Sequence, residues 1–130
     1  MNKKEVKQII NQIYPKIKNY YGKSEYSDHF PSIKYHHNIY ARITGEESMK
    51  GEISPAAEFE RETNTIWIYY PEAKDKKWVI QTVLHEYAHY LQDGDEMKRL
   101  YDEGYEYNNH PFELEAIDAE ANWEVFGRAK

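Results

Sequence analysis

A series of apolar residues at helical spacing is the feature that most limits how this chain can fold. They recur three or four positions apart and comprise Val79, Ile80, Val83, Leu84, Tyr87, Ala88 and Leu91. This spacing predicts a helix from about Lys76 to Gln92, capped by Asp75 and followed by Gly94. The 130 residues include no cysteine, which excludes disulfides, so we expect a single modest apolar core to hold the chain together.

Two patterns precede this helix. Residues Lys3–Tyr21 carry apolar side chains on one helical face and are followed by Gly22, which predicts an N-terminal helix. Pro15 lies inside this pattern and is expected to kink the helix or split it at Tyr14. From 33 to 44 the period changes to two, which predicts a half-buried strand.

Further elements follow from short patterns around polar turns. Residues 57–62 and 65–70 predict a hairpin that turns at Thr63 and Asn64. Residues 95–109 read as a loop with at most a turn of helix, and a last helix is expected from Pro111. The resulting prediction is a single α+β domain over 1–130, with an N-terminal helix and a small, mainly antiparallel sheet.

The central predicted helix contains two histidines. The run His85-Glu86-Tyr87-Ala88-His89 is an HExxH pattern, and residues four apart project from one helical face. Two imidazoles on one face can bind a single cation, and Zn²⁺ accepts imidazole and carboxylate ligands. Glu86 lies to the side of this face, where it can accept a proton from a water that the metal activates. The pattern predicts one Zn²⁺ per chain, with His85 and His89 as ligands and Glu86 as general base.

A third protein ligand is expected from the helix that follows Pro111. The apolar stripe of that helix comprises Phe112, Ala116, Ala119, Trp123 and Phe126. Glu115 borders this stripe beside small alanines, so we expect Glu115 to be the third ligand. Glu113 lies on the other margin and is the alternative. Glu120 and Glu124 are expected to be solvated.

This combination of residues resembles a known group of enzymes. The motif, followed 26 residues after His89 by Glu115, is similar to the gluzincin branch of the HExxH zinc metallopeptidases, especially the small single-domain zincins of bacteria and phages. The resemblance covers roughly residues 66–126 and implies a zincin-like domain. It implies zinc binding by His85, His89 and Glu115 and general-base catalysis by Glu86. Many gluzincins carry an aspartate four residues after the ligand glutamate, a position that is apolar here.

The resemblance also implies a function, a zinc-dependent peptidase that hydrolyses peptide bonds. In that family the strand before the metal helix binds extended substrate, so Thr65–Tyr70 is expected to be an edge strand that pairs with a peptide or protein substrate. Two alternatives stay open: a non-catalytic binding or regulatory module of the same fold, and a regulatory protease with a single protein target. Glu86 mildly favours catalysis, because a structural zinc site needs no base.

Other residues between the two helices have alternative interpretations. His110 could supply a third imidazole, although its place before Pro111 equally suits a helix-entry residue. Tyr101, Tyr105 and Tyr107 lie where a phenol could donate a hydrogen bond to an oxyanion, although such tyrosines more often cover a core.

Charge and hydropathy exclude several other classes of protein. Lysine and arginine number 17 against 23 aspartates and glutamates, a formal charge of −6, so we expect no nucleic-acid partner. No apolar run approaches the roughly 18 residues that span a bilayer, so we expect no membrane partner. The first residues lack the apolar core of a signal peptide, which favours a cytoplasmic location, or a virion location for a phage-encoded chain.

Overall fold

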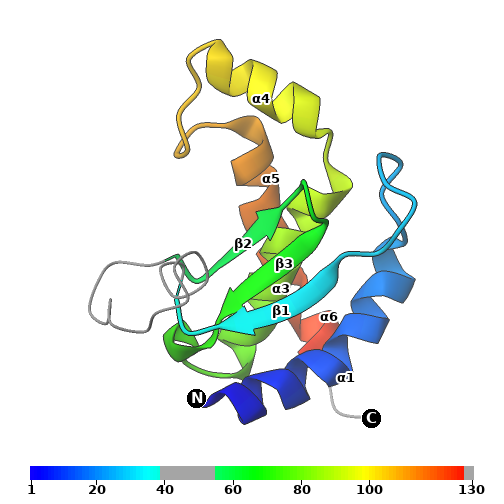
Figure 1. Cartoon of the computed structure of the whole chain (residues 1–130), viewed down its shortest axis with the longest axis vertical. Coiled ribbons are helices and arrows are strands. Elements are labelled where there is room, and N and C mark those ends of the chain that lie inside the picture. Colours follow the sequence, from blue (N-terminus) through cyan, green and yellow to red (C-terminus); the bar gives the residue numbers. More distant parts are fainter. Residues whose placement is uncertain (39–54, 128–130) are drawn as a thin grey trace.

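The long apolar pattern forms the central helix of the structure. The computed structural model describes residues 1–38 and 55–127. In it, α3 (Lys76–Leu91) is capped by the Asp75 carboxylate, which accepts a hydrogen bond from the Trp78 amide. Buried side chains occur around most of the circumference of α3, and the helix lies behind the sheet in Figure 1. The predicted helix and its cap are confirmed.

The N-terminal helix, α1 (Lys3–Tyr21), packs one apolar face against the core. Its buried side chains are Val6, Ile10, Ile13 and Ile17. Asn2 and Glu5 form a capping box at its start, and Gly22 follows its end with a φ of 73°. Pro15 lies inside α1, so the predicted split at Tyr14 is wrong. Ile13 and Ile17 bury apolar surface on both sides of Pro15, and this packing keeps the helix continuous despite the lost backbone hydrogen bond.

The predicted hairpin is present. β2 (Ala57–Glu60) pairs antiparallel with β3 (Thr65–Tyr69). Asn64 lies in the turn with a φ of 52°, a left-handed conformation that asparagine tolerates better than most residues. A 3₁₀ turn, η1 (Tyr70–Glu72), then leads toward α3.

Among the described residues the sheet has three strands in the order β1-β3-β2, so β3 is the central strand. β1 (Ser32–His36) pairs parallel with β3, which makes the sheet mixed rather than mainly antiparallel as predicted. The prediction that Thr65–Tyr70 is an edge strand is also wrong. The apolar run in β3 is nearly continuous and its side chains are buried on both faces, as is typical of a central strand. The expected strand residues from 39 to 44 lie outside the described part of the chain.

Shorter helices complete the structure. α4 (Gly94–Asp102) forms where mainly loop was predicted, because Asp93 caps it. The predicted last helix is interrupted: α5 (Pro111–Ala119) is followed by a 3₁₀ turn, η2 (Glu120–Asn122), and by α6 (Trp123–Gly127).

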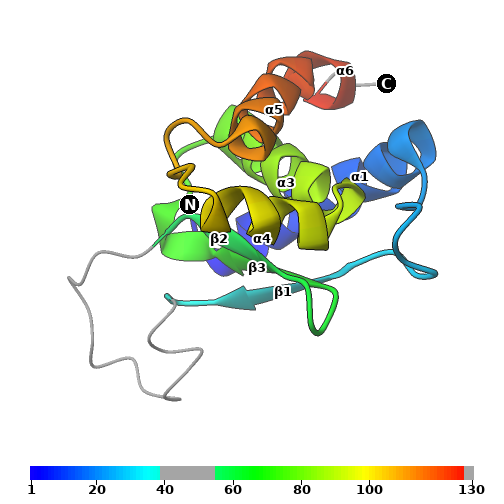
Figure 2. The same cartoon turned by 90° about the horizontal axis from the view of Figure 1, so that it is seen from above.

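The elements form an α+β arrangement of layers. Figure 2 shows the sheet on one side of α3 and shows α5 and α6 on the other side. Side chains of α1, α3, α6 and β3 share one apolar core. Within the described ranges, no helix combines the length and apolar character that crossing a bilayer requires.

Candidate metal centre

The two histidines of the motif lie on the face of α3 that is turned toward α5. His85 and His89 are one turn apart, and their ring centroids are 5.0 Å from each other. Both side chains are largely buried, at 14% and 10% exposure. Burial lowers the pKa of His89, although the charge of Glu113 opposes this effect. The neutral imidazole thus favoured is the form that binds a metal ion.

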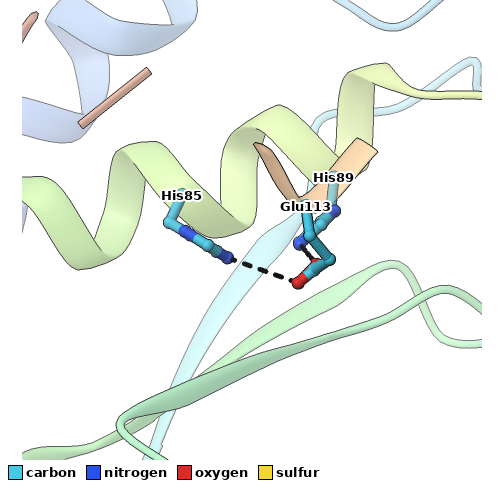
Figure 3. A group of neighbouring side chains, drawn as sticks. All are labelled: His85, His89 and Glu113. Carbon is cyan, nitrogen blue, oxygen red and sulfur yellow. Dashed lines mark ion pairs between the residues drawn. The ribbon is translucent and has the colours of Figure 1, made fainter. Parts of the chain in front are cut away.

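Glu113 of α5 lies opposite both imidazoles. Its carboxylate Oε1 lies against Nε2 of His89, and its Oε2 lies 4.0 Å from Nε2 of His85. Figure 3 shows the three side chains pointing toward one another from the two helices. Their ligand atoms all lie within 4.8 Å of one another. This is the group of potential metal ligands that the structure brings together.

Glu113 is only 2% exposed, and among the described residues its Oε2 is buried without a hydrogen-bond partner. A buried carboxylate oxygen that no donor satisfies costs free energy, and a cation at this place would compensate that cost. This oxygen and the two imidazoles therefore fit a bound divalent cation.

The other nitrogen of each imidazole is held by an acceptor. Nδ1 of His85 lies 2.9 Å from a carboxylate oxygen of Glu120, and Nδ1 of His89 lies 2.8 Å from the amide oxygen of Gln92. Because both partners accept, each Nδ1 carries the proton and each Nε2 lone pair is left to face Glu113. Such outer partners orient metal-binding histidines and raise their affinity.

Glu115, the expected third ligand, does not face the histidines. It lies at the exposed side of α5, where one of its oxygens accepts a hydrogen bond from Gln92 at 3.1 Å. Gln92 also donates to the Phe112 carbonyl and binds His89, so Glu115 contacts the centre only through Gln92. The structure places the alternative, Glu113, at the centre instead.

The physical reason is the orientation of α5. The prediction of Glu115 assumed that the apolar stripe of this helix is its buried face. In the structure, the most buried side chains of α5 are those of Glu113 and Ala116. Leu114 and Ile117 are instead 47% and 48% exposed. Glu120 lies two turns after Glu113 on the same face, so it contacts His85 although it was expected to be solvated.

His110 caps α5 and does not belong to the metal group. Its Nδ1 accepts a hydrogen bond from the Phe112 amide, and its Nε2 lies 3.0 Å from the Met97 carbonyl. Both ring nitrogens are therefore occupied, which agrees with the helix-entry interpretation. Tyr101 packs against the His110 ring, with 4.2 Å between the centroids, and this ring in turn supports the start of α5.

Arg61 ties the hairpin to the end of the metal helix. Its guanidinium donates to the carbonyls of His89 and Gln92 at 2.9 and 3.1 Å. The His89 carbonyl belongs to the last turn of α3 and the Gln92 carbonyl to its C-cap, where a cation also complements the helix dipole. A side chain at Gly94 would collide with Arg61, so glycine at this position makes room for the contact.

Glu86 is buried beside the two histidines. Burial, together with the charges of Glu113 and Glu58, raises its pKa to about 8, while a backbone hydrogen bond from Phe59 acts in the opposite direction. The Phe59 contact places the carboxylate of Glu86 against the edge strand β2. Glu86 therefore lies between the metal group and the strand, as expected of a base that acts at this centre.

A cleft opens over the metal group along β2. On one side, a cavity of about 520 Å³ is bounded by β2, the three potential ligands, Met97 and Tyr107. On the other side, a second cavity of about 350 Å³ is bounded by Trp78, Gln81 and Thr82 of α3. His85, Glu86 and Tyr107 line both cavities, so the cleft extends in two directions from the centre. Of the three tyrosines considered from the sequence, it is Tyr107 that borders the two cavities.

Comparisons with models of protein families, with curated proteins and with solved structures gave no match. The donor set itself indicates which cation fits. Two imidazole nitrogens and one carboxylate oxygen, with an open side toward a cleft, are the set typical of catalytic zinc sites. Structural zinc sites instead close the coordination with four protein ligands.

We predict that Zn²⁺ affinity depends on Glu113 far more than on Glu115. Glu113→Ala removes the carboxylate that faces both imidazoles and should lower affinity at least about 100-fold, whereas Glu115→Ala, which loses one contact to Gln92, should lower it less than about tenfold. Competition with a chromogenic chelator measures both values. A larger loss for Glu115→Ala than for Glu113→Ala would reverse this assignment.

Glu120 should increase Zn²⁺ affinity by holding the His85 ring in place. Glu120→Ala removes the acceptor that fixes the His85 ring, and we expect Zn²⁺ affinity to fall about 10–100-fold while one ion still binds per chain. Glu124→Ala, which changes an exposed glutamate of α6, is the matched control and should leave affinity unchanged. Equal affinities for the two variants would show that the Glu120 contact has no role in binding.

Metal-free protein should become less stable as Glu86 ionises. Because folding raises the pKa of Glu86 from 4.5 to about 8, the folded state binds this proton more tightly, and stability is lost as pH rises through this range. Glu86→Gln should therefore stabilise the metal-free fold by roughly 2–4 kcal/mol at pH 8 but by less than about 1 kcal/mol at pH 5. Urea unfolding in the presence of a chelator tests this, and an equal effect at both pH values would contradict it.

Proposed function

We propose that this chain is a zinc-dependent peptidase. The observation that carries the proposal is the convergence of the two His Nε2 atoms and the unpartnered Glu113 oxygen beside the buried Glu86. In this proposal His85, His89 and Glu113 hold one Zn²⁺. The bound ion would polarise the scissile carbonyl and lower the pKa of a water molecule at the site. The small zincin-like metallopeptidases remain the family that the motif resembles.

Glu86 is the proposed general base. Its carboxylate accepts a proton from the attacking water and then returns that proton to the nitrogen of the leaving amine. The surroundings of Glu86 suit this cycle. Burial and the nearby Glu113 charge favour the protonated form, whereas a cation at the centre would favour the ionised form. The two effects oppose each other, which lets Glu86 both take up and release a proton near neutral pH.

Tyr107 is the proposed donor to the developing oxyanion. It borders both halves of the cleft, on the segment between α4 and α5. Burial, the negative charges of Glu113 and Glu86 and a side-chain hydrogen bond to Glu113 raise the pKa of Tyr107, so its phenol keeps its proton at neutral pH. A protonated phenol at this place can donate a hydrogen bond to the carbonyl oxygen as charge develops on it.

The substrate is proposed to lie along β2 rather than β3. β2 is the edge strand that borders the cleft, and an extended peptide can pair with its outer edge. Because the cleft extends on both sides of His85 and Glu86, we propose cleavage inside a peptide rather than removal of a terminal residue. Glu58 and Glu60 also line the cleft and favour substrates with basic residues near the cleaved bond.

The alternative of a non-catalytic binding module fits the site less well. A metal that only stabilises the fold needs neither an open side toward a cleft nor a buried carboxylate beside its ligands. The structure has both features, and Glu86 is held against β2 by the Phe59 amide. A protease with a single protein target would use the same chemistry, so it differs from the proposal only in the range of substrates.

Glu86→Gln tests the proposed base. This variant should bind Zn²⁺ as the unmodified protein does but hydrolyse peptides at least about 100-fold more slowly, because proton transfer is lost while the ligands are kept. Cleavage of a mixed library of unstructured dodecapeptides, analysed by mass spectrometry, measures the rate and the cleaved bonds. Glu62→Gln, which changes an exposed glutamate of the hairpin, is the control and should keep full activity.

Two outcomes would contradict the proposal. Undiminished hydrolysis by Glu86→Gln would mean that another group acts as the base. Failure of the zinc-loaded protein to cleave any peptide of the library, even at high enzyme concentration, would contradict general peptidase activity and leave the single-target protease or the binding module.

A further inference from the structure

Positive charge is concentrated in the first part of the chain. Residues 1–38 contain seven lysines and three acidic residues, although the whole chain has a formal charge of −6. The remaining residues are therefore strongly acidic, and several of their carboxylates line the metal cleft. This separation of charge places a basic surface on α1 and β1.

A groove of about 620 Å³ lies on this basic surface, between α1 and β1. Four lysines line it, at positions 3, 7, 18 and 34, and no acidic residue does. Its floor is formed by apolar and aromatic side chains that include Ile10, Tyr14 and Tyr35. Tyr14 also donates a hydrogen bond to the Pro31 carbonyl at 2.5 Å, which ties α1 to the entrance of β1.

Three of the four lysines of the groove lie against aromatic rings rather than against carboxylates. The Nζ atoms of Lys7 and Lys34 lie 5.6 Å from the ring centroids of Tyr35 and Trp67, and Lys18 lies 4.8 Å from that of Tyr14. Within the described ranges, none of the four lysines forms an ion pair with an acidic residue. Their charges are therefore available to an anionic partner.

The wall of the groove opposite α1 is a strand edge. Among the described residues, 32–35 of β1 pair with β3 alone, and no residue of β3 lines the groove. The outer edge of such a strand can pair with an extended chain through main-chain hydrogen bonds. We propose that this groove binds an extended acidic peptide segment of another protein, which adds a strand to β1 and places its carboxylates among the four lysines.

The lysines also disfavour a second copy of this chain as the occupant of the groove. A second copy of this chain, paired through its own β1, would bring Lys34 of each copy together, and like charges repel. The groove borders β1, at the opposite edge of the sheet from β2 and the metal cleft. The proposed site is therefore separate from the metal centre, and it does not rest on the proposed peptidase activity.

Fluorescence anisotropy with a labelled dodecapeptide of alternating Glu and Thr tests this inference. The full chain should bind this peptide, and added salt should weaken binding, because lysine–carboxylate contacts are screened. The double variant Lys7→Glu, Lys34→Glu should bind at least about tenfold more weakly. The control variant Lys16→Glu, Lys23→Glu has the same net charge but changes exposed lysines outside the groove, and it should bind within about threefold of the unmodified chain.

A second peptide and an oligonucleotide complete the experiment. A dodecapeptide of alternating Glu and Pro carries the same charge but lacks half of the N–H groups needed for strand pairing, so it should bind at least about tenfold more weakly. Circular dichroism confirms that each variant folds. No binding of the Glu–Thr peptide, equal losses in the two double variants, equal binding of the Glu–Pro peptide, or tighter binding of a twelve-nucleotide single-stranded DNA would each overturn the proposal.

Discussion

The packing of α3 against α5 around a buried carboxylate is the interaction on which the rest of the structure depends. Glu113 is almost fully buried, and the imidazoles of His85 and His89 are the groups that face it. A buried charge is costly unless paired groups surround it, so this contact requires the two helices to meet in one register. His110 at the start of α5 and Gln92 after α3 hold that register with hydrogen bonds from each side.

The elements with local patterns were predictable from the sequence. The periodicity and cap of α3, the apolar face of α1 and the turn at Asn64 all involve residues close in the chain, and the structure contains each of them. The spacing of His85 and His89 likewise fixes their common face on α3. These predictions succeeded because local geometry alone determines which side chains lie together.

Features that depend on distant contacts were not predictable in the same way. The parallel pairing of β1 with β3 joins residues far apart in the sequence, and it makes β3 central rather than an edge. The prediction of Glu115 rather than Glu113 as the third ligand does not match the structure. An apolar stripe does not reveal the buried face of a helix when that face carries carboxylates. The contact of Glu120 with His85 could have been predicted from the sequence, because Glu120 lies two turns after Glu113 on the same helical face.

The two edges of the sheet differ in charge and in surroundings. β2 borders an acidic cleft with potential metal ligands, while β1 borders a groove lined by lysines and aromatic rings. The central strand β3 separates them, so one extended polypeptide chain could contact both edges only by passing around the sheet. We infer that the proposed peptidase site and the proposed peptide-binding groove recognise segments of different charge.

X-ray absorption spectroscopy of the zinc-loaded chain tests the central claim, that two imidazoles and the Glu113 carboxylate share one ion. The account predicts multiple-scattering features of two histidine ligands, with nitrogen and oxygen ligands at about 2.0–2.2 Å. It further predicts that replacing Glu113 by alanine removes one oxygen ligand or the bound ion itself. A spectrum with one imidazole or none, or one that does not change in the Glu113 variant, would contradict the account.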